Sequence, residues 1–383
     1  MSLYFFSIHF ELWDPLNTNI DYLFTKITIV FYFLVSIGRI KQSNEIKKFT
    51  KFIIPIVLLF IIQTVSGYLN QSPGHTEYFS LIFFLNIIMF LLMLIHHQKD
   101  NNAILTGLNS YVLGAIFLTL FFFLGIESDN SWHNRATVFG QNQNILAINL
   151  SVGLLIILYR LFDYNKLNNK IIILYIVSIP FIMIFMADTG SRSGIISFVL
   201  GIIVFFLLKK TRNTIGKIGR IFVGFLTIFV IALYFLNNDV VGARLNNSLN
   251  YVDLSGRDNT WRELIPLFRL NPFFGMGMTG YTKVTEEIFG YYTSAHNSFI
   301  ETTIIGGFSS MLLLLIFLYL IIRKAKHDNR VNGSILSLMF LAPIFVEFTV
   351  GQAFGSKILW GLYVFIIGYR LNDKKHINWK KLN

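Results

Sequence analysis

Residues 251–307 read YVDLSGRDNTWRELIPLFRLNPFFGMGMTGYTKVTEEIFGYYTSAHNSFIETTIIGG. A long polar stretch here leads without a break into an apolar run of membrane-crossing length. Most of the remaining chain consists of apolar runs and short connectors. Binding and catalytic residues are concentrated on loops that a rigid scaffold positions. We therefore expect this polar stretch to carry the functional groups of the protein.

The composition indicates a membrane protein. Hydrophobic residues make up 54% and charged residues 14% of the 383 residues, whereas about a quarter of a soluble domain is charged. We predict an all-α, polytopic helical membrane protein in which 1–383 form one integral membrane domain. Because the chain has no cysteine, thiol catalysis, disulfides and Cys-based metal sites are excluded. The net charge of +12 is interpreted as a topology signal, and no nucleic-acid partner is expected.

Eleven apolar runs reach or approach the about 17–25 residues that a transmembrane helix needs. They fall near 21–38, 52–69, 78–95, 104–125, 144–162, 171–187, 194–208, 221–236, 297–322, 334–350 and 356–370. The segment 1–13 would be a twelfth, partial span or an interfacial segment, and the sequence leaves both readings open.

The basic residues predict the orientation of these spans. Most of the 32 Lys and Arg fall in alternate connectors, which lie at 39–51, 96–103, 160–170, 209–220, 323–330 and 370–383. Since basic loops stay in the cytoplasm, we predict a cytoplasmic C-terminus and a large extracytoplasmic loop at 237–296. The expected location is the cytoplasmic (inner) membrane.

The few basic residues of the predicted outer side are mainly arginines. Arginine grips phosphate or carboxylate through a planar fork, whereas lysine is a hydrated point charge. An arginine-biased outer surface therefore favours a site for an anionic ligand. The alternative is that these arginines pair with neighbouring acidic residues, namely Asp188, Asp253, Asp258 and Glu263.

His296 stands where the large loop re-enters the predicted membrane. His296 and Asn297 open an apolar run that reaches Ile322, and Glu301 would share one helix face with Asn297. The outer end of this helix is its N-terminus, which favours an anion. Histidine suits acid–base chemistry near neutral pH. The alternative is that His296 and Asn297 only cap the helix.

Two short connectors on the same predicted side carry further arginines. Arg192 lies between two spans with scarcely any loop, so it would sit near membrane depth, where a charged residue is paired or functional. Asp188, four residues earlier, is its obvious structural partner. Arg135 precedes a polar group of residues that leads into another span, at 141–144.

Within the large loop, Arg257 and Trp261 are four residues apart, with Arg262 beside them. A Gly/Pro turn follows at 271–277. The aromatic residues of the loop would form either an interfacial belt or a platform for sugar rings.

These residues together resemble the O-antigen ligase and polysaccharide polymerase (Wzy/WaaL-like) superfamily. The resemblance rests on TGSRSG at 189–194, GR-x3-W at 256–261, NPFFGMG at 271–277 and HNSFIETTIIGG at 296–307, with R-x3-FGQNQN at 135–144 as an earlier element. The order of these short motifs and their shared predicted side make the combination more specific than any one of them.

The resemblance implies a glycosyltransferase that uses a polyprenyl-diphosphate-linked saccharide, without a metal or other cofactor. Carried over by position, Arg192 and Arg257 would hold the diphosphate and His296 would lie at the reacting centre. The implied catalytic residues are then His296, Arg192 and Arg257, and the implied substrate-binding residues are Arg135, Asn297, Arg262, Trp261 and Glu301.

Three functions fit these observations. The first is a polymerase that joins lipid-linked repeat units into a surface polysaccharide such as O-antigen, capsule or exopolysaccharide. The second is a ligase that transfers a finished glycan to a lipid or protein acceptor. The third, a transporter of lipid-linked saccharides, is disfavoured because inverted repeats are not apparent. Expected partners are the lipid-linked oligosaccharide, a growing glycan or lipid acceptor, membrane lipids and chain-length regulator proteins.

Overall fold

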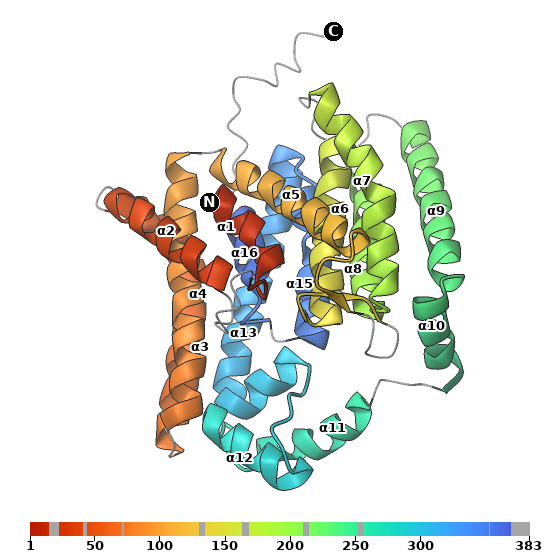
Figure 1. Cartoon of the computed structure of the whole chain (residues 1–383). Helices are drawn as coiled ribbons and strands as arrows, with labels where there is room; N and C mark the ends of the chain where they lie inside the picture. The colour runs from red at the N-terminus through yellow and green to blue at the C-terminus, as the bar shows by residue number, and fades with distance from the viewer. Residues whose placement is uncertain are drawn as a thin grey trace.

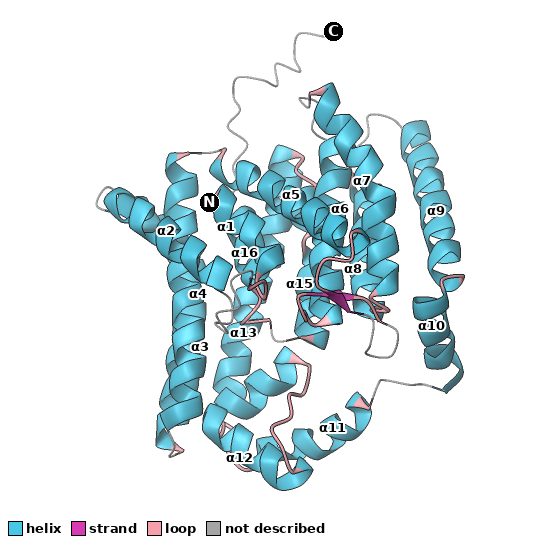
Figure 2. Cartoon of the chain, in the orientation of Figure 1, coloured by secondary structure: helices cyan, strands magenta, loops and turns pink. Residues whose placement is uncertain are grey.

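The computed structural model describes residues 1–14, 23–40, 44–70, 73–100, 102–129, 135–162, 168–209, 214–251, 256–351 and 353–368. Helices dominate these residues (Figure 2). The exception is a two-residue pairing of β1 (Ser128–Asp129) with β2 (Thr137–Val138). The basic C-terminal segment at 370–383 lies outside the described residues, so a cytoplasmic C-terminus stays a prediction.

All eleven predicted apolar runs form helices. They are α2 (Leu23–Ile40), α3 (Thr50–Leu69), α4 (Pro73–Lys99), α5 (Ala103–Phe123), α6 (Gln143–Phe162), α7 (Asn169–Asp188), α8 (Arg192–Leu208), α9 (Thr214–Leu236), α13 (Ser298–Asn332), the pair α14 (Leu336–Met339) and α15 (Leu341–Val350), and α16 (Lys357–Gly368). Seven helices in the described part of the chain are long and apolar enough to cross a membrane, and shorter apolar helices accompany them. The chain is thus a multi-pass helical membrane protein, and eleven crossings stay a prediction.

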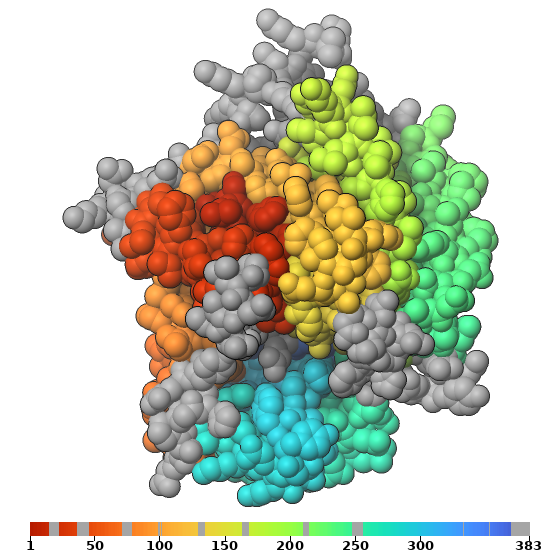
Figure 3. All heavy atoms as spheres, viewed as in Figure 1, coloured from red at the N-terminus to blue at the C-terminus, as the bar shows by residue number. Residues whose placement is uncertain are grey.

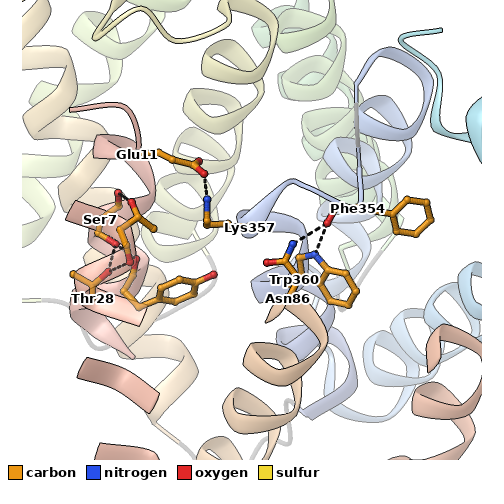
Figure 4. A network of polar contacts seen from close by, with 9 residues as sticks. Ser7, Glu11, Thr28, Asn86, Phe354, Lys357 and Trp360 are labelled. Carbon is orange, nitrogen blue, oxygen red and sulfur yellow. Dashed lines mark hydrogen bonds and ion pairs between the residues drawn. The ribbon is translucent and has the colours of Figure 1, made fainter. Parts of the chain in front are cut away.

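The N-terminal segment is a short buried element. α1 (Ser2–Ser7) and η1 (Ile8–Phe10) pack against α5, where Gly107 lies in contact distance of Phe5 and Gly114 in that of His9. Figure 4 shows the polar contacts that hold this segment, including an ion pair between Glu11 and Lys357 of α16. The segment is too short to cross a bilayer alone, and its assignment as a partial span or an interfacial segment stays a prediction.

Close packing of α6 against α8 sets the position of the helix that begins with Arg192 (Figure 1). A Cβ on Gly194 would lie 2.4 Å from the Ala147 Cβ, and one on Gly201 would lie 2.5 Å from a Leu155 methyl group. Small residues at such crossings let helices approach closely in a membrane. The first turns of α6 and α8 therefore lie side by side.

The predicted loop 237–296 is largely helical. It forms α10 (Asp239–Tyr251), α11 (Arg257–Leu264), η3 (Ile265–Arg269) and α12 (Gly277–Phe289). In Figure 1, α10 continues below α9 at the edge of the bundle, whereas α11 and α12 lie beneath its centre. The space-filling view places the α11–α12 region as a separate layer at the lower end (Figure 3). This layer has a small core of its own, centred on Leu264, Met276 and Tyr281.

The predicted span at 297–322 is not one continuous helix. Gly307 interrupts α13 with φ +67° and ψ −167°. The backbone of the 271–277 turn replaces lost helical hydrogen bonds, because Phe308 N–H donates to the Pro272 carbonyl (2.7 Å) and Met276 N–H donates to the Ile304 carbonyl (2.9 Å). Gly307 admits the backbone of this turn, since a Cβ at this position would lie 2.4 Å from the Phe273 carbonyl group.

Candidate functional site

The turn between α7 and α8 fixes the position of Arg192. Gly190 has φ +61°, a left-handed conformation that glycine adopts easily. A Cβ at this position would lie 3.3 Å from Arg135 Cγ, so a larger residue would disturb both the turn and its neighbour. Ser191 caps α8 by accepting a hydrogen bond from Gly194 N–H, which places Arg192 in the first turn of the helix.

The carbonyl groups of this turn anchor two arginines from other parts of the chain. Arg135 Nε donates to the Thr189 carbonyl oxygen at 2.8 Å. Arg244 Nη1, from α10, donates to the Gly190 carbonyl oxygen at 2.6 Å. Two guanidinium groups are thereby held beside the N-terminus of α8, where the helix dipole also favours an anion.

The loop that carries Arg135 is fixed to the same turn. Ala136 N–H donates to the Asp188 carbonyl (2.8 Å). The side-chain oxygen of Asn144, at the start of α6, accepts hydrogen bonds from Arg135 Nη2 (3.2 Å) and Ser191 Oγ (3.0 Å). Arg135 is buried, so these bonds hold its side chain in one orientation.

Four arginines share one electrostatic environment, and we call Arg135, Arg192, Arg244 and Arg257 the arginine cluster. Burial, and after it the charges of the other three arginines, lower the pKa of Arg135 to about 10. The pKa of Arg257 is also lowered, first by burial and then by Arg192 and Arg244. Because arginine side chains are cationic in proteins, the cluster carries a concentrated positive charge.

The Asp188 side chain makes a hydrogen bond to an amide at the start of α10. The Asp188 carboxylate accepts a hydrogen bond from the Asn238 side chain (3.3 Å). Asp258 and Glu263 are exposed on α11, and Asp253 lies outside the described residues. This contact of Asp188 therefore does not support the alternative that Asp188 neutralises Arg192.

The residue before His296 is held on both sides of its backbone. Trp261 Nε1 donates to the Ala295 carbonyl (2.7 Å), and Ala295 N–H donates to the Tyr281 hydroxyl (2.9 Å). The same hydroxyl donates to the Thr293 carbonyl (3.0 Å). We call these hydrogen bonds the Ala295 strap. Because Trp261 lies on α11 one turn after Arg257, the strap connects the helix of the arginine to the backbone of the histidine.

His296 adopts an unusual backbone conformation beside the arginine cluster. Its φ of +47° is uncommon for a residue other than glycine and persists where the surroundings enforce it. The residue reaches solvent, yet its partial burial and then the charge of Arg257 lower its pKa from the ordinary value of about 6.5. The imidazole is therefore mainly neutral at pH 7, the form that accepts a proton.

Asn297 is the residue that caps α13. Its side-chain oxygen accepts hydrogen bonds from two backbone N–H groups of the first turn, at 3.0 and 3.2 Å. Glu301, one turn later, accepts a hydrogen bond from the Ser294 hydroxyl, which itself accepts from His296 N–H at 3.0 Å. Asn297 and Glu301 thus hold the segment that carries His296, whereas His296 itself does not cap the helix.

The structure places most of the predicted site residues in one region. Arg135, Arg192 and Arg257 belong to the arginine cluster, and the Arg257 charge acts on His296. Arg262 lies apart, because five residues correspond to about 140° around a helix and its side chain is exposed. A role for Arg262 in substrate binding stays a prediction.

The sequence-based prediction of the site did not include Arg244, Asn144 or Tyr281. Arg244 could have been found among the outer basic residues, since it also opposes the positive-inside trend. Asn144 belongs to the polar group at 141–144, but the sequence does not show that it bonds to Arg135 and Ser191. The hydrogen bonds of Tyr281 to the backbone of Thr293 and Ala295 are likewise tertiary contacts.

One comparison with known proteins bears on this site. Residues 174–318 match the family model described as O-antigen ligase. The matched range contains the α7–α8 turn, Arg244, Arg257 and His296, whereas Arg135 and Asn144 precede it. No curated protein matches the chain. The resemblance to the O-antigen ligase and polymerase superfamily is therefore confirmed over these residues.

Proposed function

We propose that this chain, which is similar to the O-antigen ligase family over residues 174–318, is a glycosyltransferase that polymerises polyprenyl-diphosphate-linked repeat units outside the cytoplasmic membrane. The observation that carries the proposal is the arginine cluster beside a histidine with a lowered pKa. A cluster of cations suits a diphosphate, and a neutral imidazole suits an acceptor hydroxyl.

In the proposed reaction, the acceptor hydroxyl oxygen attacks the anomeric carbon of the donor saccharide. His296 accepts the hydroxyl proton, a new glycosidic bond forms, and the bond between the anomeric carbon and the diphosphate oxygen breaks. The negative charge that grows on the leaving diphosphate is stabilised by the arginine cluster. Fixed charges aimed at developing charge lower the barrier, because they stabilise the transition state more than the ground state.

The bound diphosphate would also assist the proton transfer. Arg257 lowers the pKa of His296 in the protein without substrate. A diphosphate on the arginines offsets this positive charge, so the basicity of His296 increases when the donor is bound. The histidine is thus neutral before donor binding and a stronger base after it.

The test uses the full-length protein in nanodiscs with a polyprenyl-diphosphate-linked oligosaccharide as both donor and acceptor. We expect His296→Ala to reduce extension by roughly 100- to 10,000-fold while donor binding survives. Arg257→Lys should weaken donor binding, because lysine lacks the bidentate fork. Arg269→Gln, an exposed change on the same loop, is the control. Normal extension by both His296→Ala and Arg257→Lys would refute the proposal.

The ligase alternative uses the same site and differs only in its acceptor. Deletion of the protein in its host followed by glycan sizing distinguishes the two functions. Loss of long chains with survival of single attached repeats supports the polymerase. Accumulation of long chains that are not attached to their final acceptor supports the ligase.

A further inference from the structure

A second site lies at the opposite end of the bundle. Between the C-terminal ends of α6 and α8 and the first turns of α9 there is a cleft of about 280 Å³. Its lining combines aromatic and aliphatic side chains with two cations; the residues are Phe162, Phe205, Phe206, Lys209, Arg220 and Val223. The basic connectors that predict the cytoplasmic side include 209–220, so this cleft belongs to the predicted inner leaflet.

The two cations of this cleft are fixed by backbone carbonyls. Lys209 Nζ donates to the Phe162 carbonyl (2.5 Å) and lies 5.0 Å from the centre of the Phe205 ring. Arg220 Nε donates to the Phe206 carbonyl (2.7 Å). These contacts hold both cations at the cleft.

Arg220 retains a donor group that the described chain does not use. Its Nη1 atom is buried and has no hydrogen-bond partner in the described part of the chain. A buried donor without a partner is costly, and such groups in native proteins are normally satisfied by a ligand, an ion or water. The cleft therefore offers a fixed guanidinium donor to an oxygen-rich anion.

The apolar walls of the cleft identify the kind of anion. α9 exposes a broad apolar surface, on which Phe222 and Phe225 are 67% and 69% exposed. Gly224 brings this helix against α8, since a Cβ there would lie 2.5 Å from the Phe206 ring. The apolar lining is thus continuous with the lipid-facing surface. A free phosphate would leave these walls bare, whereas a phospholipid would cover them with an acyl chain.

We infer that this cleft binds an anionic phospholipid of the inner leaflet, with the phosphate at Arg220 and Lys209 and an acyl chain along Phe206 and Val223. Basic pockets between transmembrane helices on the cytoplasmic side suit such headgroups. The bound lipid would add to the contact between α9 and α8. Through α9 it would also support α10, which carries Arg244.

The experiment uses the full-length protein, delipidated in detergent, with phosphatidylglycerol and phosphatidylcholine of identical acyl chains as probes. Native mass spectrometry measures bound lipid, and thermal unfolding measures stabilisation. We expect phosphatidylglycerol to bind more tightly than phosphatidylcholine, and Arg220→Gln to weaken it by about fivefold, the contribution of one cation. Lys217→Gln, an exposed change on the same helix, should bind like the parent.

Three results would overturn the inference. They are equal binding of the two lipids, unchanged phosphatidylglycerol binding by Arg220→Gln, and competition by inorganic phosphate at the same concentration as the lipid, which would indicate a free-phosphate site. If Arg220→Gln does not elute as folded protein, Val223→Trp takes its place. That change fills the apolar part of the cleft without removing either cation, and it should also lower phosphatidylglycerol binding.

Discussion

Replacing Trp261 with phenylalanine tests the Ala295 strap. The ring is retained, but the donor of the 2.7 Å hydrogen bond to the Ala295 carbonyl is lost. Ala295 is 0% exposed, so water does not readily replace the donor. An unsatisfied buried acceptor costs about 1–3 kcal/mol. If the whole cost fell on the placement of His296, turnover would drop by roughly 5- to 150-fold.

The assay is glycan extension by the protein in nanodiscs, with donor binding measured separately. Trp360→Phe is the matched control. It removes an indole donor to the Phe354 carbonyl (3.1 Å) from a buried tryptophan in α16, away from the site. We expect Trp360→Phe to lose less stability than Trp261→Phe, because Asn86 Nδ2 still donates to the Phe354 carbonyl (2.9 Å), and we expect only Trp261→Phe to lose turnover. Full turnover by Trp261→Phe together with loss by Trp261→Ala would refute the strap and favour a sugar platform.

Two further changes probe the histidine and the break in α13. The pKa of His296 is lowered by burial and by Arg257, so the proton-accepting form of the imidazole should be lost only as pH falls through that lowered pKa. In Arg257→Gln the pKa should rise, and this form should be lost at higher pH. The pH dependence of diethylpyrocarbonate labelling of His296 measures the shift. Gly307→Ala should destabilise the protein by more than about 1–3 kcal/mol, because φ +67° with ψ −167° is a conformation that is nearly confined to glycine and its Cβ would also lie 2.4 Å from the Phe273 carbonyl group. Gly290→Ala, with φ +78° and open space around it, adds a side chain at positive φ without a clash, and equal melting temperatures for the two variants would contradict the predicted clash.

The membrane helices could be predicted from the sequence because each is a local property. A run of apolar residues that covers the bilayer must form a helix, since no water is present to satisfy its backbone. All eleven predicted runs are helical for this reason. The sequence did not predict the burial of the short N-terminal segment, because this burial depends on two glycines in α5, Gly107 and Gly114.

The break at Gly307 could not be predicted from the run that contains it. Residues 297–322 are apolar throughout most of their length, and glycine is common in transmembrane helices. The break is stabilised by hydrogen bonds to Pro272 and by the close approach of Phe273. These residues precede Gly307 by more than thirty positions in the sequence, so a tertiary contact causes the break.

The candidate site was predictable in its residue types but not in its organisation. Arginine bias on the predicted outer side indicated Arg135, Arg192 and Arg257, and the position of His296 at the end of the polar loop indicated the histidine. The sequence did not predict that backbone carbonyls of one turn would anchor Arg135 and Arg244. Such anchoring depends on the path of the backbone, which side-chain patterns do not encode.

The manner in which Arg135 is anchored bears directly on the proposed catalysis. Its hydrogen bonds go to the Thr189 carbonyl and the Asn144 side-chain oxygen, which are neutral acceptors. A carboxylate in either position would fix the guanidinium equally well but would cancel its charge. Neutral acceptors fix the orientation and leave the charge available to an anionic ligand. Burial and then mutual repulsion lower the pKa of Arg135 and Arg257. A diphosphate bound as we propose would relieve this repulsion, so the same arrangement of arginines would serve donor binding and charge stabilisation.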